Sequence, residues 1–234
     1  MNNLEMKNEF LILYDKFTNF DAPGYEDEEI SVFLTKGQER VFFGHFNPLA
    51  NKYREGFEET ESRRKDIKEL VKGAKGLAPA TDQTEALPNG KLFDLPSDCL
   101  YVISEEIVLE SDNNCLNNKR IMVKPVTHDE YSINVKNPFA RPDKDLAWRL
   151  DINGGRHEII TDGTSIKSYD IRYVETLRPI IIGANVIDGV LGPLDCKFNS
   201  ILHKRIVDEA VKIATGVTNP EQYQIKTIEN NENE

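Results

Sequence analysis

Apolar residues recur every three or four positions near both ends of this chain, which is the spacing of helices with one buried face. The pattern predicts a C-terminal helix over Phe198–Ala214, with Ile201 on its buried face and His203 and Lys212 on its solvent face. A first helix is predicted over Leu4–Phe17. We therefore expect the two ends of the chain to pack together.

A second helix is predicted between the acidic run Glu26–Glu29 and Asn47-Pro48. Negative charge stabilises the start of a helix, and the residue before a proline is disfavoured in helical conformation. Gly37 lies on the apolar stripe of this helix, which indicates that another backbone approaches closely there. A third helix is predicted between Glu59 and Val71, where opposite charges are spaced four residues apart.

Residues 73–92 are predicted to form a long loop, because glycine and proline are frequent in this stretch and apolar residues are few. Loops of this length are uncommon inside compact domains. Two interpretations stay open: a mobile surface loop, or an arm that lies on a neighbouring subunit.

Strand-forming residues dominate the middle of the chain. The runs 101–109 and 120–126 are rich in β-branched and aromatic residues and predict two strands. Thr127 and Glu130 have the spacing of a capping box, which predicts a short helix after the second strand. The run Ile180–Ile182 is a candidate for one more strand.

Three further runs predict a meander. Residues 146–152, 156–161 and 165–174 are separated by Asn153-Gly154-Gly155 and Asp162-Gly163, both typical of hairpin turns. We therefore expect each of these strands to pair with the next.

The expected fold class is α+β, with helices from both chain ends forming a bundle and a central, mainly antiparallel β-sheet subdomain. The expected divisions follow the chain. They are a helical part (1–72), a long loop or arm (73–92), a β subdomain (93–183), a C-terminal loop and helix that packs on the N-terminal helices (184–216), and a flexible tail (217–234).

Composition narrows the function. With 40 acidic and 29 basic residues, the formal net charge of −11 argues against a free-standing nucleic-acid binder, because phosphate binding needs clustered lysine and arginine. The negative charge is compatible with a structural protein that DNA slides past without being bound. Three scattered cysteines without a CxxC motif indicate a reducing cytoplasm. No apolar run approaches the roughly 20 residues that span a bilayer, and the first residues lack a signal-peptide pattern.

Candidate chemistry is sparse. The four histidines form no HExxH pair, and His128, in an acidic local setting, is interpreted as structural or exposed. Glu105 and Glu106 are expected on opposite faces of a strand, which prevents shared acid–base work, and Trp148 is expected in the core. We therefore predict a protein that is not an enzyme, with no catalytic residue, no cofactor and no metal site.

Several stretches in a consistent order along nearly the whole chain carry a family resemblance. They are Ala22–Tyr25, Glu29–Gln38, Phe57–Arg64, Val123–Tyr131, Asn137–Pro142, Arg149–Asp151, Asp170–Tyr173, Leu177–Ile181 and the helix Cys196–Ala214. Together they resemble a head–tail connector of crAss-like bacteriophages, a ring or adaptor protein of the virion.

This resemblance implies a structural protein of a short-tailed phage virion, assembled in the bacterial host cytoplasm. Its ring at the portal vertex would join head to tail and surround the DNA channel. Matching a portal implies a closed ring of about twelve copies. The implied partners are further copies, the portal protein, other tail or ring proteins, and genomic DNA that passes without sequence-specific binding; no membrane is implied. Another tail or collar ring and a cytosolic non-catalytic binding module stay open as alternatives.

Mixed charges on two predicted helices supply a candidate subunit or portal interface. Its residues are Glu59, Arg63, Arg64, Lys204, Arg205 and Asp208. The alternative interpretation is an ordinary solvated helix surface, since exposed ion pairs contribute only about 0–1 kcal/mol each. The loop 73–92 and the tail after Gly216 are further candidates, as segments that become ordered on assembly.

Overall fold

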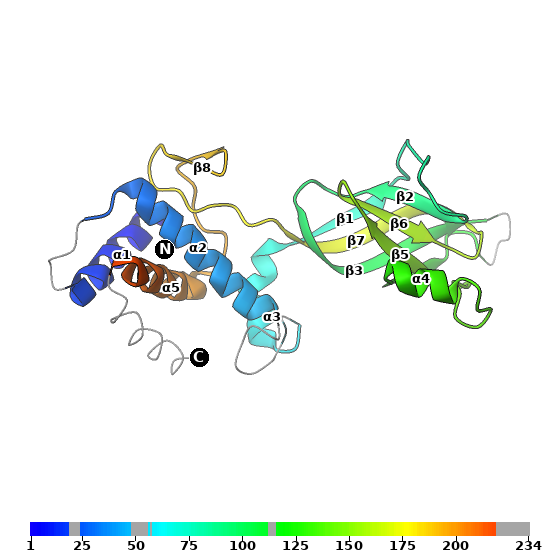
Figure 1. Cartoon of the computed structure of the whole chain (residues 1–234), viewed down its shortest axis with the longest axis horizontal. Coiled ribbons are helices and arrows are strands. Elements are labelled where there is room, and N and C mark those ends of the chain that lie inside the picture. The colour runs from blue at the N-terminus through cyan, green and yellow to red at the C-terminus, as the bar shows by residue number, and fades with distance from the viewer. Residues whose placement is uncertain (19–23, 48–55, 57, 112–115, 219–234) are drawn as a thin grey trace. The chain divides into compact units, whose positions relative to one another are not determined.

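A computed structural model describes residues 1–18, 24–47, 56, 58–111 and 116–218. The chain divides into two compact units: Met1–Leu70 with Leu177–Glu234, and Val71–Thr176. The first unit holds the long helices and the second holds the main sheet (Figure 1). The α+β class predicted from the sequence is confirmed. Cys115, and the expected tail from residue 219 onward, lie outside the described residues.

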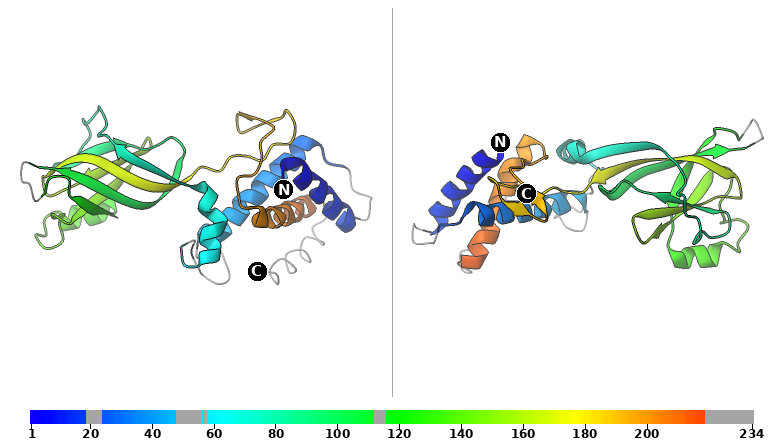
Figure 2. Two further views of the ribbon diagram at one scale, coloured as in Figure 1. Left: turned by 180° about the vertical axis from the view of Figure 1, so that it is seen from behind. Right: turned by 90° about the horizontal axis from the view of Figure 1, so that it is seen from above.

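The helical unit is built from both ends of the chain. Its helix α5 packs against both α1 and α2, which confirms that the two termini come together (Figures 1 and 2). Asn3 fixes the start of α1 from within the unit: its backbone N–H donates to Asp195 Oδ1 (2.8 Å) and its side-chain amide donates to the Ile181 carbonyl (2.9 Å). The helices are α1 (Asn3–Thr18), α2 (Asp27–Phe46), α3 (Glu61–Ile67) and α5 (Ser200–Thr218).

Helix α2 begins and ends where the sequence predicts. Glu26 is its N-cap and forms a capping box with Glu29, while Asn47 is its C-cap. Because the capping box satisfies backbone N–H groups that have no partner within the helix, it defines the helix start locally. Helix α3 is shorter than predicted: it begins after the N-cap Thr60, continues as a 3-10 turn over Lys68–Leu70, and gives way to a strand.

The buried face of α5 is wider than its apolar stripe. Ile201, expected inside, is 71% exposed, whereas His203 and Lys212, expected in water, are buried. The His203 ring donates from Nε2 to the Phe198 carbonyl oxygen (2.9 Å), and Lys212 Nζ lies 3.5 Å from Glu209 Oε1. All three predictions were wrong. His203 and Lys212 are buried because α5 is covered from two sides, by α1 and by α2, whereas Ile201 lies on the part of α5 that stays exposed.

The sheet unit contains seven strands in the order β1-β7-β3-β4-β5-β6-β2. All neighbouring pairs are antiparallel except β4 and β5, which are parallel and connected through α4 (His128–Asn134). The predicted capping box of α4 is confirmed at Thr127 and Glu130. The strands are β1 (Val71–Leu77), β2 (Gly90–Asp94), β3 (Cys99–Glu110), β4 (Arg120–Pro125), β5 (Leu146–Ile152), β6 (Arg156–Ile160) and β7 (Ser165–Glu175).

Three local predictions in this region were wrong. Residues 73–92 are not one loop, because β1 pairs with β7 and β2 pairs with β6. The meander ends after one hairpin: β5 pairs with β6, but β6 and β7 are not neighbours in the sheet. The run Ile180–Ile182 contributes only an isolated bridge between Ile181 and Leu194, and it precedes the small hairpin of β8 (Val186–Ile187) and β9 (Val190–Leu191).

The seven-stranded sheet curls around its own core. Side chains from β2 through β7 form one buried cluster. In it the Phe93 ring of β2 contacts the Tyr169 ring of β7 at a tilt of 53°, although these strands lie far apart in the sheet order. Trp148 is 3% exposed, as predicted, and packs with Leu150 and Ile160 beneath α4. The curl therefore brings distant strands close enough for their polar side chains to meet.

Candidate functional site

Two of the six predicted interface residues meet near the end of α2. The Arg205 guanidinium of α5 lies with Nη1 3.2 Å from His45 Nε2, and Arg63 of α3 donates from Nη1 to the Gly44 carbonyl (3.3 Å). On the other side of the ring, His45 Nδ1 lies 3.7 Å from Asp66 Oδ2. These contacts join α2, α3 and α5 around one buried imidazole.

Burial and two arginines together set the protonation of this cluster. The pKa of His45 is lowered to about 4, chiefly by burial and additionally by the positive charges of Arg205 and Arg63. His45 is therefore neutral at pH 7, and a neutral ring that accepts from Arg205 at Nε2 carries its proton on Nδ1, facing Asp66. Burial also raises the pKa of the Asp66 carboxyl, an effect that the same two arginines oppose.

The other four predicted interface residues do not join this cluster through the described contacts. Glu59, Arg64 and Lys204 are exposed, and Asp208 is half-buried. Glu59 precedes the N-cap Thr60 and so lies outside α3. Within α3, two opposite charges spaced four residues apart do form an ion pair, with Lys65 Nζ 2.8 Å from Glu61 Oε1. Of the six residues, Arg63 and Arg205 thus contact the buried end of α2, and the role of all six in an interface stays a prediction.

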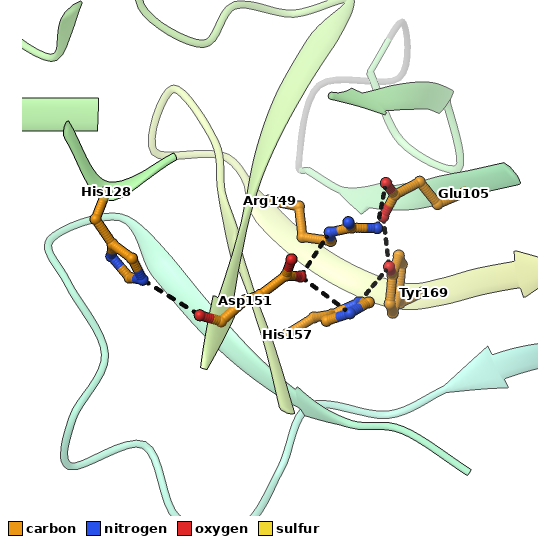
Figure 3. Close-up of polar contacts among 6 residues, drawn as sticks. All are labelled: Glu105, His128, Arg149, Asp151, His157 and Tyr169. Carbon is orange, nitrogen blue, oxygen red and sulfur yellow. Dashed lines mark hydrogen bonds and ion pairs between the residues drawn. The ribbon is translucent and has the colours of Figure 1, made fainter. Parts of the chain in front are cut away.

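A second polar network lies inside the curled sheet (Figure 3). The Tyr169 hydroxyl of β7 donates to Glu105 Oε2 of β3 (2.6 Å), and Arg149 of β5 donates from Nη1 to Glu105 Oε1 (2.8 Å). His157 of β6 lies with Nδ1 2.9 Å from the same Tyr169 hydroxyl. Four strands are therefore connected through a single buried carboxylate and a single phenol.

Asp151 extends the network toward solvent. Its Oδ1 lies 3.0 Å from Arg149 Nε and 3.3 Å from His157 Nε2, and its carbonyl oxygen lies 3.2 Å from His128 Nε2 (Figure 3). His128 is exposed, as predicted. The two adjacent acids on β3 do separate: the Glu105 side chain is 7% exposed and that of Glu106 is 52% exposed, on opposite faces.

Burial governs the protonation of this network. It lowers the pKa of His157 to about 4, with Arg149 acting in the same direction, and it raises the pKa values of Glu105 and Tyr169. At neutral pH the imidazole and the phenol are therefore uncharged, and the Tyr169 hydroxyl donates to Glu105. A neutral imidazole carries one proton, so His157 donates either to the Tyr169 hydroxyl through Nδ1 or to Asp151 through Nε2, and not to both. Sequence reasoning missed this network because its members come from four strands and share no local motif.

The stretch Asn137–Pro142 lies on the surface of the sheet unit. It follows α4, and its Phe139 side chain is 98% exposed. Ile133 on α4 is 73% exposed, so that apolar side chains gather at this edge of the unit. An exposed apolar surface of this kind is typical of a contact with another protein.

Among the residues that the structure describes, no three or more His, Cys, Asp or Glu side chains are grouped so that they could hold a metal ion. No helix within the same described ranges has the length and apolar character needed to cross a membrane.

The fold and its surfaces define a two-unit α+β protein with charged helices on one unit and an exposed apolar edge on the other. The model of a family described as phage tail ring protein 3/4 matches residues 1–224, which cover both units. The chain belongs to this family and is a ring protein of the crAss-like phages. The resemblance seen in the sequence is thereby confirmed.

Two relatives from Bacteroides phage crAss001 align with almost the full chain. "Ring protein 4/5" is 33% identical over 226 residues, covering 92% of this chain and 92% of its own length. "Ring protein 3" is 27% identical over 219 residues, covering 92% of this chain and 95% of its own length. The similarity therefore extends over the helical unit and the sheet unit alike.

Proposed function

We propose that this chain is a non-catalytic structural protein of a short-tailed phage virion. It forms a closed ring at the portal vertex, joins head to tail and surrounds the DNA channel. The observation that carries this proposal is the family match over residues 1–224, because it includes both structural units rather than one shared domain. The relatives' names describe rings, and neither names an enzyme.

Ring closure sets the stoichiometry. A head-to-tail ring uses two different faces of each subunit and closes only when the rotation between neighbours divides the circle, so matching a portal gives about twelve copies. The proposed partners are further copies of the chain, the portal protein, and other tail or ring proteins. Assembly takes place in the bacterial host cytoplasm, and the product is part of the virion.

The acidic balance of the chain supports a passive DNA channel. The formal net charge is −11, and an acidic surface repels phosphate instead of gripping it. Genomic DNA then passes through the lumen without sequence-specific binding. Tight binding of DNA by the assembled ring at physiological salt would contradict this part of the proposal.

The charged helix surface is the proposed site of subunit or portal contact. Arg63 and Arg205 converge on His45, which holds their helices together, while Arg64 and Lys204 extend into solvent with Glu59 and Asp208 nearby in sequence. Because exposed charges contribute more to orientation and association rate than to affinity, these residues would fix the register of neighbouring subunits.

A second candidate is another tail or collar ring of the same virion. The two relatives support it, because they carry different ring numbers within one phage. In that case the chain binds other ring proteins and makes no direct contact with the portal.

Native mass of the full chain, alone and mixed with the cognate portal, tests these assignments. A ring of portal stoichiometry, or a monomer that assembles only on the portal, supports the connector. Assembly with other ring proteins but not with the portal would indicate that the chain forms another ring of the virion. A stable monomer or dimer indifferent to all of these proteins would reject the ring and favour a binding module.

A further inference from the structure

A surface pocket of about 670 Å³ opens beside α4 on the sheet unit. Its apolar lining includes Tyr131, Val135 and Phe139, with the buried Trp148 behind them. Phe139 is 98% exposed, so a large apolar side chain stands in solvent at the rim. Apolar surface with this exposure is stabilised when a partner covers it.

The pocket also presents unused hydrogen-bond donors. The side chains of Arg141 and Lys144 line it, and neither side chain makes a polar contact with another residue of the described chain. The acids of the lining are engaged: Asp143 accepts from the Leu146 backbone N–H (2.9 Å), Asp145 pairs with Lys119 (2.5 Å), and Asp162 accepts from the Thr164 backbone N–H (3.1 Å). A fitting occupant therefore combines apolar side chains with a carboxylate or another acceptor.

The β8–β9 hairpin of the helical unit has these properties. Its side chains include Val186, which is 58% exposed, and Leu191, which is 68% exposed. Asp188 and Gly189 form its turn with positive φ (50° and 76°), and the Asp188 carboxylate stands exposed at the tip. The hairpin is thus a narrow apolar projection that ends in an acceptor.

We propose that the β8–β9 hairpin of one copy docks in the pocket beside α4 of a second copy. The proposal rests on the ring of the preceding section. A head-to-tail contact needs two different, complementary surfaces on every chain. The described residues offer a convex hairpin with exposed apolar side chains, and a pocket that combines apolar side chains with the cationic side chains of Arg141 and Lys144. In the complex, Val186 and Leu191 cover Phe139, and the Asp188 carboxylate accepts from Arg141 or Lys144.

Two single variants of the full chain test the contact. Leu191→Asp alters only the hairpin and Phe139→Asp alters only the pocket; both positions are exposed, so both variants should keep the wild-type unfolding midpoint. Under conditions in which the wild type assembles, each variant alone is expected to weaken assembly roughly tenfold or more. Ile12→Asp, at an exposed apolar position on α1, is the matched control and should assemble normally.

Mixing the two variants makes the test specific. An intact hairpin on one chain and an intact pocket on the other leave one competent contact, so the mixture should form a heterodimer that cannot extend, seen by native mass spectrometry. If both variants are monomeric and their mixture forms no dimer, the pairing is wrong. Should either substitution disturb the fold, the experiment is repeated with two milder proteins. Leu191→Ser alters the hairpin in one of them, and the double variant Arg141→Ala, Lys144→Ala alters the pocket in the other.

The outcomes separate this inference from the ring itself. Normal assembly of both variants would overturn the hairpin contact and leave the ring intact. Failure of the wild type to assemble with itself, the portal or other ring proteins would instead reject the ring. A rival occupant of the pocket is the acidic C-terminal stretch, which is removed in a chain truncated after Gly216. If the truncated chain fails to assemble while Leu191→Asp still assembles, the pocket is assigned to that stretch and the hairpin contact is rejected.

Discussion

Gly37 of α2 lies directly against the backbone of Ile206 in α5. A Cβ atom placed on Gly37 would stand 2.6 Å from the Ile206 carbonyl oxygen and 3.0 Å from the Ala210 backbone nitrogen. Both neighbours are helix backbone, which cannot move aside as a flexible side chain can. The close packing of α2 on α5 at this point thus depends on the absence of one methyl group.

Gly37→Ala should therefore destabilise the protein, although alanine is the better helix former by about 1 kcal/mol. Overpacking at a well-packed contact typically costs about 1–3 kcal/mol, so the net loss in the free energy of unfolding should be about 0–2 kcal/mol. Urea denaturation followed by far-UV circular dichroism measures it.

Gly44→Ala in the same helix is the matched control. A Cβ atom there has nothing within 4 Å, so this substitution should stabilise the protein by about 0.4–1 kcal/mol. If both variants shift stability in the same direction and by the same amount, the α2–α5 contact does not have the closeness described.

Tyr169→Phe should destabilise the sheet unit. The hydroxyl donates to the buried Glu105 and contacts His157, so its removal leaves polar groups without a partner, at about 1–3 kcal/mol. Tyr131→Phe is the control, because the described residues offer its hydroxyl no hydrogen bond, and it should change stability by less than about 0.5 kcal/mol. Equal unfolding midpoints for the two variants would contradict a structural role for the network.

The protonation of His45 should make stability fall below neutral pH. Its folded pKa is about 4 against 6.5 for an unperturbed histidine, so between these values the unfolded chain binds a proton that the folded state excludes. The contribution is fully present above pH 6.5 and is lost as the pH falls toward 4, by up to about 3 kcal/mol. His45→Gln should reduce the slope of the urea unfolding midpoint against pH between pH 7 and 5. An unchanged slope would refute the assignment of this pH dependence to His45.

Charge reversal tests the predicted helix surface. Arg64→Glu with Lys204→Glu should leave the unfolding midpoint within about 0.5 kcal/mol, because both side chains are exposed. If they contact a neighbouring subunit or the portal, assembly should weaken roughly tenfold and depend more strongly on salt. Lys124→Glu, an exposed change on β4, is the control; identical assembly by both proteins would mean that the helix charges are ordinary solvated surface.

Local signals predicted well wherever neighbours in sequence are also the physical partners. The capping boxes at Glu26 and Thr127 act within three residues, and both helices begin where predicted. Likewise, the turn Asn153-Gly154-Gly155 joins two strands that do pair. The close approach of another backbone at Gly37 could be predicted because a glycine on the apolar stripe of a helix seldom has another structural reason.

The same reasoning failed where the partner is distant in sequence. Asp162-Gly163 has the composition of a hairpin turn, yet the strands on either side pair with β5, β2, β1 and β3 instead. Gly73 and Gly76 made β1 resemble a loop, but its backbone pairs with β7, and that pairing does not require an apolar side chain. His203 was placed in water because one helix in isolation shows only one apolar stripe.

What the sequence by itself determined is the set of helices, the starts of α2 and α4, the α+β class and the membership in a family of ring proteins. These properties follow from residue periodicity, from contacts within one turn, or from similarity along the whole chain. Only the tertiary structure decided the strand order, the Glu105–Tyr169–His157 network and the meeting of Arg63 and Arg205 at His45. Each of these depends on which distant segments the curl of the sheet and the packing of α5 bring together, and no local pattern encodes that choice.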